Sequence, residues 1–285
     1  MKRKITESLI RWKGRLSGRM PLLVYGARQV GKTHIIREFG KDHYKNVAYF
    51  NLETNQTVAG YFSDNIEPER ILCFLEAESR ERIVPGKTLV IFDEIQFCPR
   101  ALTALKYFNE QTPEYHIISA GSLLGVAINR GQYSFPVGNV DSLMMFPLDF
   151  EEYLWASGEE MLCAEIKDAF DKNKALPIAL HEKSLDLYKQ YLITGGMPQA
   201  ILAFVETKTL LTVPDVQNKI MNDYIADMAK YATNTQSVKI RAAYNSIPVQ
   251  LAKENKKFQY KLAQHGGYFW RSHRLAGLRG YRTEM

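Results

Sequence analysis

Residues 26–33 read Gly26-Ala27-Arg28-Gln29-Val30-Gly31-Lys32-Thr33, and this octet, which fits the pattern GxxxxGK[ST], decides the fold. In such a loop the glycines permit the dihedral angles that turn successive backbone N–H groups toward phosphate oxygens. A helix that begins near Gly31 adds the positive end of its dipole. We therefore predict that all eight residues bind a nucleotide, with the Lys32 ammonium at the β- and γ-phosphates and the Thr33 hydroxyl on Mg²⁺. The alternative is a glycine-rich turn with an exposed lysine.

The second signal is an acidic pair at the end of the most apolar stretch of the chain. Residues 88–92 are apolar on both faces, as a central parallel strand must be, and Asp93 and Glu94 follow them. A parallel sheet presents its ligands at the carboxyl ends of its strands, beside the phosphate loop. We predict that Asp93 holds Mg²⁺ and that Glu94 polarises a water for attack on the γ-phosphate. Taken alone, such an acidic pair is more typical of a loop start.

Strands alternate with helices around these two motifs. The apolar patterns predict strands at 22–25, 47–52, 88–92, 115–120 and 140–146, and helices around 31–39, 68–80 and 99–108. Alternation at this spacing implies parallel pairing through right-handed crossovers. The predicted fold class is α/β, a three-layer P-loop NTPase sandwich with a parallel five-stranded sheet, followed by a mostly helical lid domain.

The sequence also bears on which nucleotide is bound. A guanine-selecting Asn/Thr-Lys-x-Asp motif is absent, which disfavours GTP. A further strand is expected to separate the phosphate loop from the acidic strand in the sheet, which is the arrangement of ATPases. We therefore predict ATP and Mg²⁺ as the ligands.

Changes of pattern along the chain predict four segments. An amphipathic helix opens the chain within residues 1–19, and the α/β core spans 20–148. Residues 149–265 are predicted to be mostly helical, with a strong helix stop at Gly195-Gly196-Met197-Pro198. Residues 266–285 form an atypical basic tail, because arginine replaces the lysine of the preceding segment and helical periodicity is lost. A frameshift near residue 266, and hence a truncated product, is one hypothesis for the tail, and a natural basic tail is the other.

Composition excludes several classes of protein. With 46% hydrophobic and 24% charged residues, the 285-residue chain resembles an ordinary soluble globular protein. No apolar run is long enough to cross a bilayer and no secretion signal is evident, so we expect a cytoplasmic protein without membrane contact. Three cysteines without a CxxC pair are interpreted as packing residues. Both ends are basic and the middle is acidic, which is weak evidence for nucleic acid.

Five stretches together resemble a known family. They are residues 26–33, Ile-Phe-Asp-Glu-Ile-Gln (91–96), Ala-Gly-Ser-Leu-Leu (120–124), Phe-Pro-Leu-Asp-Phe-Glu-Glu-Tyr-Leu (146–154) and Gly-Gly-Met-Pro (195–198). They look like a bacterial and archaeal AAA+-type ATPase family, closer to origin-recognition ATPases than to protein unfoldases. Over about residues 20–265, the resemblance implies an AAA+-like ATP-binding core, a helical lid and a partial winged-helix segment. Members usually continue into a C-terminal domain of unknown function.

The resemblance also implies two further site residues. The polar residue that ends the strand between the acidic motif and the last strand would be the first sensor, which contacts the attacking water or the γ-phosphate. Ser122 is the first choice and Ser119 the alternate, although Ser122 also suits a simple helix cap. An arginine that reaches the γ-phosphate of a neighbouring subunit would imply a homo-oligomer. Arg130 lies near the expected place in the sequence. The alternative, and the commoner interpretation of such a residue, is a solvated surface arginine.

The resulting functional prediction is a Mg²⁺-dependent ATPase that hydrolyses ATP to ADP and phosphate to drive a conformational switch. One alternative is an ATP-binding regulatory or DNA-associated module with negligible turnover, which has a DNA or protein partner. The other is a phosphotransferase, which would need a second pocket with its own acid and arginines. The sequence offers no such cluster.

Overall fold

The computed structural model describes residues 1–122, 138–230 and 234–252. Contacts divide the chain into two compact units, Met1–Pro214 and Asp215–Met285. The boundary predicted near residue 148 lies inside the first unit, between the last strand and the helices that follow it. The whole basic tail (266–285) and Arg130 fall outside the described residues.

The first unit is built on one parallel sheet of five strands. The strands are β1 (Leu22–Gly26), β2 (Asn46–Asn51), β3 (Thr88–Asp93), β4 (His116–Gly121) and β5 (Asp141–Met145). Their order in the sheet is β2-β3-β4-β1-β5, and every pair is parallel. This confirms the predicted fold class. It also places β4 between the strand that leads into the phosphate loop and the strand that carries the acidic pair.

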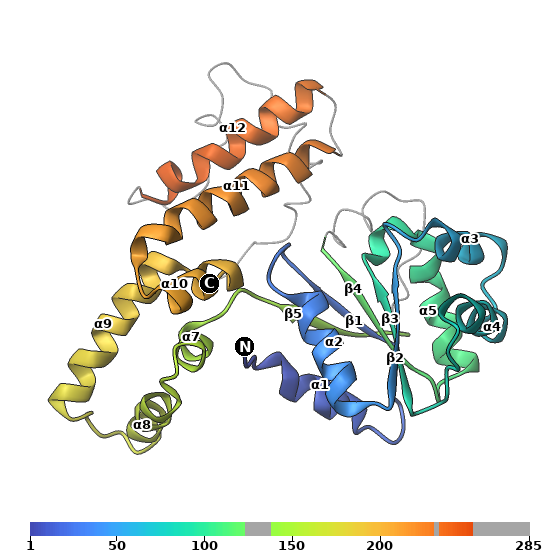
Figure 1. Cartoon of the computed structure of the whole chain (residues 1–285), viewed down its shortest axis with the longest axis horizontal. Coiled ribbons are helices and arrows are strands. Elements are labelled where there is room, and N and C mark those ends of the chain that lie inside the picture. The colour runs from blue at the N-terminus through green and yellow to red at the C-terminus, as the bar shows by residue number, and fades with distance from the viewer. Residues whose placement is uncertain (123–137, 231–233, 253–285) are drawn as a thin grey trace. The chain divides into compact units, whose positions relative to one another are not determined.

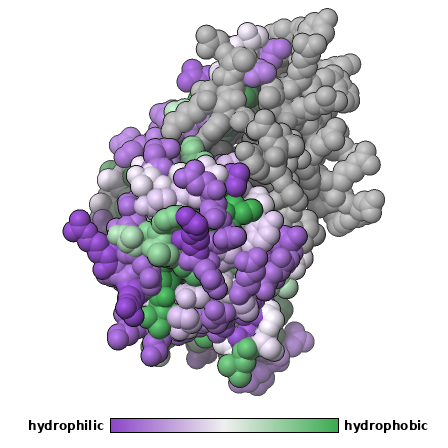
Figure 2. Space-filling view, turned by 90° about the vertical axis from the view of Figure 1, so that its right-hand side faces the viewer, coloured by the Kyte–Doolittle hydropathy of each residue, from purple (hydrophilic) through white to green (hydrophobic). Residues whose placement is uncertain are grey.

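Helices cover both faces of the sheet, which makes three layers (Figure 1). One face carries α1 (Ile5–Lys13) and α2 (Lys32–His43), and the other carries α3 (Gln56–Asp64), α4 (Pro68–Ser79) and α5 (Pro99–Gln111). Side chains alternate between the two faces along each strand. In β1, Leu22 and Val24 pack with α1 and α2, whereas Leu23 packs with α3, α4 and α5. On the side of the latter three helices, hydrophilic side chains dominate the surface and hydrophobic ones form small separate patches (Figure 2).

Local signals explain where these helices begin. Pro68 and Pro99 occupy the first position of α4 and α5, where the missing proline N–H costs nothing. Helix α3 was not predicted, because it has only nine residues and contains Gly60. Its overlooked signal is Asn55, whose side chain accepts a hydrogen bond of 3.0 Å from the backbone N–H of Val58.

The rest of the first unit is helical, as predicted. It contains α7 (Phe150–Ala156), α8 (Glu160–Asp171), α9 (Ile178–Thr194) and α10 (Pro198–Thr207), followed by a short 3₁₀ turn at Leu210–Thr212. Another 3₁₀ turn, Ile95–Phe97, lies between β3 and α5. Leu148, Tyr153 and Ile201 form a small separate core. Helix α7 begins with a capping box, in which Asp149 and Glu152 satisfy each other's backbone N–H groups.

Helix α11 (Val213–Lys230) begins at the boundary between the units, and α12 (Asn234–Leu251) follows it in the second unit. Helix α12 lies within the stretch 149–265 that was predicted to be mostly helical, and it contains Pro248. Cys98 and Cys163 are buried as expected, but Cys73 is exposed, so the interpretation of all three cysteines as packing residues is wrong for Cys73. Among the described residues, no helix has both the length and the apolar character that crossing a membrane requires.

The turn at Gly195-Gly196 fits closely against the segment that leaves the sheet. The backbone N–H of Leu148 donates to the carbonyl of Gly196 at 2.7 Å, and a Cβ on Gly196 would lie 2.3 Å from the carbonyl oxygen of Leu148. Gly196→Ala must break this contact, so we expect the free energy of unfolding to fall by about 2–3 kcal/mol in urea denaturation.

Gly60→Ala is the matched control for Gly196→Ala. Gly60 lies within α3, and a Cβ there would meet nothing within 4 Å. Alanine is expected to raise stability by about 0.5–1 kcal/mol, because glycine loses more backbone entropy in a helix. Equal effects of the two substitutions would contradict the close fit at Gly196.

Candidate functional site

The phosphate-loop motif lies where β1 ends and α2 begins. Because all five strands are parallel, their carboxyl ends meet at this edge of the sheet. Gly26 has a φ of 153°, and a Cβ there would lie 2.1 Å from the carbonyl oxygen of Met145 in the neighbouring strand. Gly31, the N-cap of α2, has a φ of 93° in the left-handed region. Both motif glycines are therefore required by backbone geometry.

The side chain of Lys32 turns back over its own loop. Its Nζ donates to the carbonyl oxygens of Gly26 at 3.1 Å and Ala27 at 2.7 Å, and only 7% of the residue is exposed. Burial lowers the pKa of Lys32, while the nearby carboxylates of Glu94 and Asp93 act in the opposite direction. A desolvated ammonium of this kind is stabilised by an additional anion.

Asp93 brings together residues that are far apart in the sequence. Its Oδ2 accepts hydrogen bonds from Thr33 Oγ1 at 2.8 Å and from the Tyr49 hydroxyl at 2.7 Å. Burial and the hydrogen bond to Asp93 raise the pKa of Tyr49 to about 12, so its hydroxyl remains a donor at neutral pH. Asp93 itself is buried at the end of β3.

The oxygens of Thr33 and Asp93 fit the requirements of Mg²⁺. This ion prefers oxygen ligands, and it is usually held by one or two protein groups together with substrate phosphates and water. Within the described ranges, no group of three or more His, Cys, Asp or Glu side chains is arranged so that it could hold a metal ion. The described residues thus offer a partial coordination shell at the phosphate loop rather than a closed metal cage.

Glu94 and Ser122 are linked through Gln96. The Nε2 of Gln96 donates to Oε2 of Glu94 and, at 3.3 Å, to the Ser122 hydroxyl. Glu94 follows Asp93 with a φ of 53°, and its backbone N–H donates to Oδ1 of Asp93 at 3.1 Å. This left-handed turn directs the second acid of the pair away from the strand and toward Gln96.

Most of the predicted site residues gather at one edge of the sheet. They are the loop 26–33 with Lys32 and Thr33, Asp93, Glu94 and Ser122. Ser119, the alternate sensor, lies inside β4 on the same face as Ile117, and its side chain is completely buried. Arg130, the predicted arginine for the γ-phosphate of a neighbouring subunit, lies outside the described residues.

Three residues at this site were not identified from the sequence. Tyr49 stands in an apolar strand, where an aromatic residue is typical of the core. Gln96 belongs to the stretch quoted for the family resemblance, which was the available signal. Arg3, which donates to the carbonyl oxygen of Val30 at 2.9 Å, is one of many basic residues near the N-terminus.

Two family models match the chain. Residues 18–154 match the model of an AAA domain, and residues 185–267 match that of a domain of unknown function. The first match includes the phosphate loop and the acidic pair. No curated protein matches the sequence.

A search of solved structures also found matches. The Walker-type ATPase PABY2304 of Pyrococcus abyssi matches with a TM-score of 0.53 at 14% identity, covering 96% of this chain and 89% of that chain. AMPPCP-bound DnaA from Aquifex aeolicus matches with a TM-score of 0.39 at 13% identity, covering 95% and 80%. The ORC1 protein of Aeropyrum pernix in complex with DNA matches with a TM-score of 0.38 at 12% identity, covering 97% and 82%. The similarity to the Pyrococcus abyssi protein shows a shared fold.

Proposed function

Because the chain belongs to the AAA+-type P-loop ATPases, with an AAA domain followed by a domain of unknown function, we propose that it binds ATP with Mg²⁺ and hydrolyses it to ADP and phosphate. Hydrolysis would drive a conformational switch. The observation that carries this proposal is the 2.8 Å contact between the hydroxyl of Thr33 and the carboxylate of Asp93. It supports a metal position between the phosphate loop and β3.

Each residue of the site has a role that follows from its chemistry. Lys32 would neutralise phosphate charge, and the N–H groups of the loop would bind phosphate oxygens. Thr33 and Asp93 would hold Mg²⁺, which when bound neutralises charge on the phosphates. Tyr49 would keep the carboxylate of Asp93 oriented.

Glu94 and Ser122 would act on the attacking water. Glu94 would accept its proton, and the hydroxyl of Ser122 would contact that water or the γ-phosphate. Gln96 connects the two side chains and would set their separation. Catalysis would then depend mainly on positioning and electrostatic stabilisation.

A homo-oligomer would complete the site if an arginine of a neighbouring copy reached the γ-phosphate. Arg130 is our candidate for this arginine, on the strength of its sequence position after β4. Such arginines are worth about 10³–10⁵ in rate, so isolated subunits are expected to hydrolyse ATP slowly.

The alternative is an ATP-binding regulatory or DNA-associated module with negligible turnover. The observation that favours it is the hydrogen bond from Gln96 to the carboxylate of Glu94, because a general base that is already engaged is less free to take a proton. In this alternative, ATP would stabilise one conformation of the protein for a DNA or protein partner.

Calorimetry and a phosphate-release assay on the full chain of known oligomeric state test the proposal. We expect ATP to bind in the presence of Mg²⁺, to bind more weakly with EDTA, and to be hydrolysed, with duplex DNA added in a parallel series. Binding without hydrolysis in every condition would support the regulatory module. Absence of Mg²⁺-dependent ATP binding by folded protein would overturn both interpretations.

A further inference from the structure

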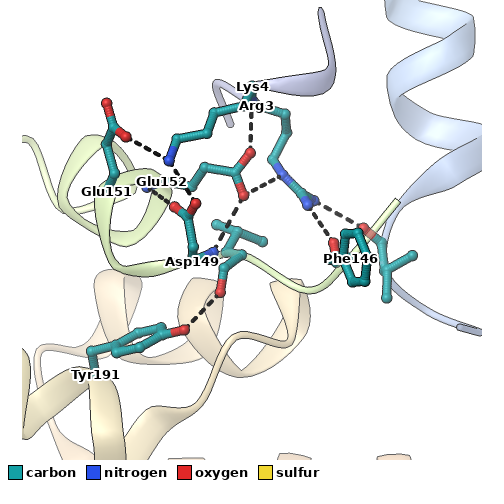
Figure 3. A network of polar contacts seen from close by, with 9 residues as sticks. Arg3, Lys4, Phe146, Asp149, Glu151, Glu152 and Tyr191 are labelled. Atoms are coloured by element: carbon teal, nitrogen blue, oxygen red, sulfur yellow. Dashed lines mark hydrogen bonds and ion pairs between the residues drawn. The ribbon is translucent and has the colours of Figure 1, made fainter. Parts of the chain in front are cut away.

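The N-terminal segment contacts the phosphate loop through Arg3, which is 7% exposed. Its guanidinium donates to the carbonyl oxygen of Val30 through Nη1 at 2.9 Å and to that of Phe146 through Nη2 at 2.7 Å. Its Nε lies 3.1 Å from Oε2 of Glu152, and the two form a buried ion pair (Figure 3). One side chain thus joins the phosphate loop, the residue after β5 and the first turn of α7.

The contact with Val30 determines the direction of one peptide group in the phosphate loop. The C=O of Val30 and the N–H of Gly31 belong to the same planar trans peptide, so they point in opposite directions. An anion-binding loop needs its N–H groups turned toward the phosphate and its carbonyls turned away. By holding the carbonyl of Val30, Arg3 keeps the N–H of Gly31 directed to the opposite side.

Glu152 makes this position of Arg3 possible. A buried guanidinium requires an opposite charge, and Glu152, itself 5% exposed, provides it. The carboxylate of Glu152 also accepts a hydrogen bond of 2.7 Å from the backbone N–H of Lys4 and completes the capping box with Asp149. Arg3 is therefore held by its own chain segment and by α7.

Given the ATP-binding function proposed above, on which this assignment rests, we propose that Arg3 is a positioning residue of the nucleotide site. It holds the Val30–Gly31 peptide in the orientation that lets the Gly31 N–H bind a phosphate oxygen. Backbone N–H groups of this kind of loop contact phosphates that ATP and ADP share. Loss of the contact therefore weakens the binding of both nucleotides, and it leaves the chemistry of Glu94 at the γ-phosphate intact.

Arg3→Lys tests the assignment, because lysine keeps the charge opposite Glu152 but cannot span both carbonyls with a planar fork. We expect the dissociation constants for Mg²⁺-ATP and Mg²⁺-ADP each to rise about tenfold, the equivalent of one hydrogen bond. The KM for ATP should rise similarly while kcat stays within about twofold, since the lost interaction is present in both the ground and transition states. A purely structural role would lower thermal stability without this selective loss of affinity.

Lys4→Gln is the matched control. Like Arg3, Lys4 joins the N-terminal segment to the start of α7, through exposed ion pairs with Asp149 and Glu151. Unlike Arg3, it makes no contact with the phosphate loop. The affinities of the Lys4→Gln variant for ATP and ADP should equal those of the wild type. If Arg3→Lys does not fold, the double variant Arg3→Met with Glu152→Gln removes both buried charges together and should show the same loss. Normal ATP and ADP binding by a folded Arg3 variant would overturn the role of Arg3, whereas failure of the wild type to bind nucleotide would overturn the proposed function.

Discussion

Replacing Glu94 with glutamine is expected to lower the rate of phosphate release at least about 100-fold, because the amide cannot accept a proton from the attacking water. ATP binding should be preserved. Glutamine has the same shape as glutamate, and its amide oxygen can still accept the hydrogen bond that Gln96 donates to the glutamate. The carboxylate of Asp93 and the ammonium of Lys32 are unchanged in this variant.

Phosphate release at saturating Mg²⁺-ATP and calorimetric ATP affinity are the two measurements for Glu94→Gln. Glu110→Gln serves as its control, because Glu110 lies on α5 in an exposed ion pair with Lys106, and neither of these residues contacts the site residues. The control should match the wild type in both measurements. Equal phosphate release by wild type and Glu94→Gln would remove Glu94 from its proposed role. Tight ATP binding without release by the wild type would instead favour the regulatory module.

The centre of the site could be predicted from the sequence because its residues belong to local patterns. The loop 26–33 carries its own glycine spacing, and Asp93 follows a strand whose burial is evident from its uniform apolar sequence. Parallel pairing then requires the two to lie at one edge of the sheet. The 2.8 Å contact between Thr33 and Asp93 is the structural counterpart of that reasoning.

The supporting residues could not be predicted, because their roles depend on contacts between distant segments. The hydroxyl of Tyr49 reaches Asp93 only because β2 pairs with β3 in a register that places Asn51 opposite Asp93. Arg3 is one of several basic residues in an exposed-looking N-terminal sequence, and nothing local marks it as buried. Helix α3 was missed for a different reason, since its single capping asparagine is a weak signal for a nine-residue helix that contains a glycine.

Replacing Lys32 with methionine is expected to weaken ATP binding at least about 100-fold, because charge-assisted hydrogen bonds to phosphate are worth roughly 1.5–3 kcal/mol each. Stability without nucleotide should change little. Burial of the ammonium is unfavourable, as its lowered pKa indicates, so its replacement by methionine removes a desolvation cost and stabilises the fold. The same substitution removes the hydrogen bonds to the carbonyls of Gly26 and Ala27, which destabilises the fold. These opposing effects should leave the free energy of unfolding within about 1 kcal/mol of the wild type.

Lys41→Met separates the role of Lys32 from a general effect of removing a positive charge. Lys41 lies in the same helix, exposed and paired with Glu38 at 2.9 Å. Calorimetric titration with Mg²⁺-ATP and urea denaturation of both variants provide the comparison. If the two variants lose ATP affinity equally, the effect comes from net charge and the loop is not a phosphate site. If only Lys32→Met loses affinity and it remains as stable as the wild type, the buried ammonium interacts with the nucleotide directly. A loss of affinity without a loss of stability means that the charge contributes to ligand binding and little to folding.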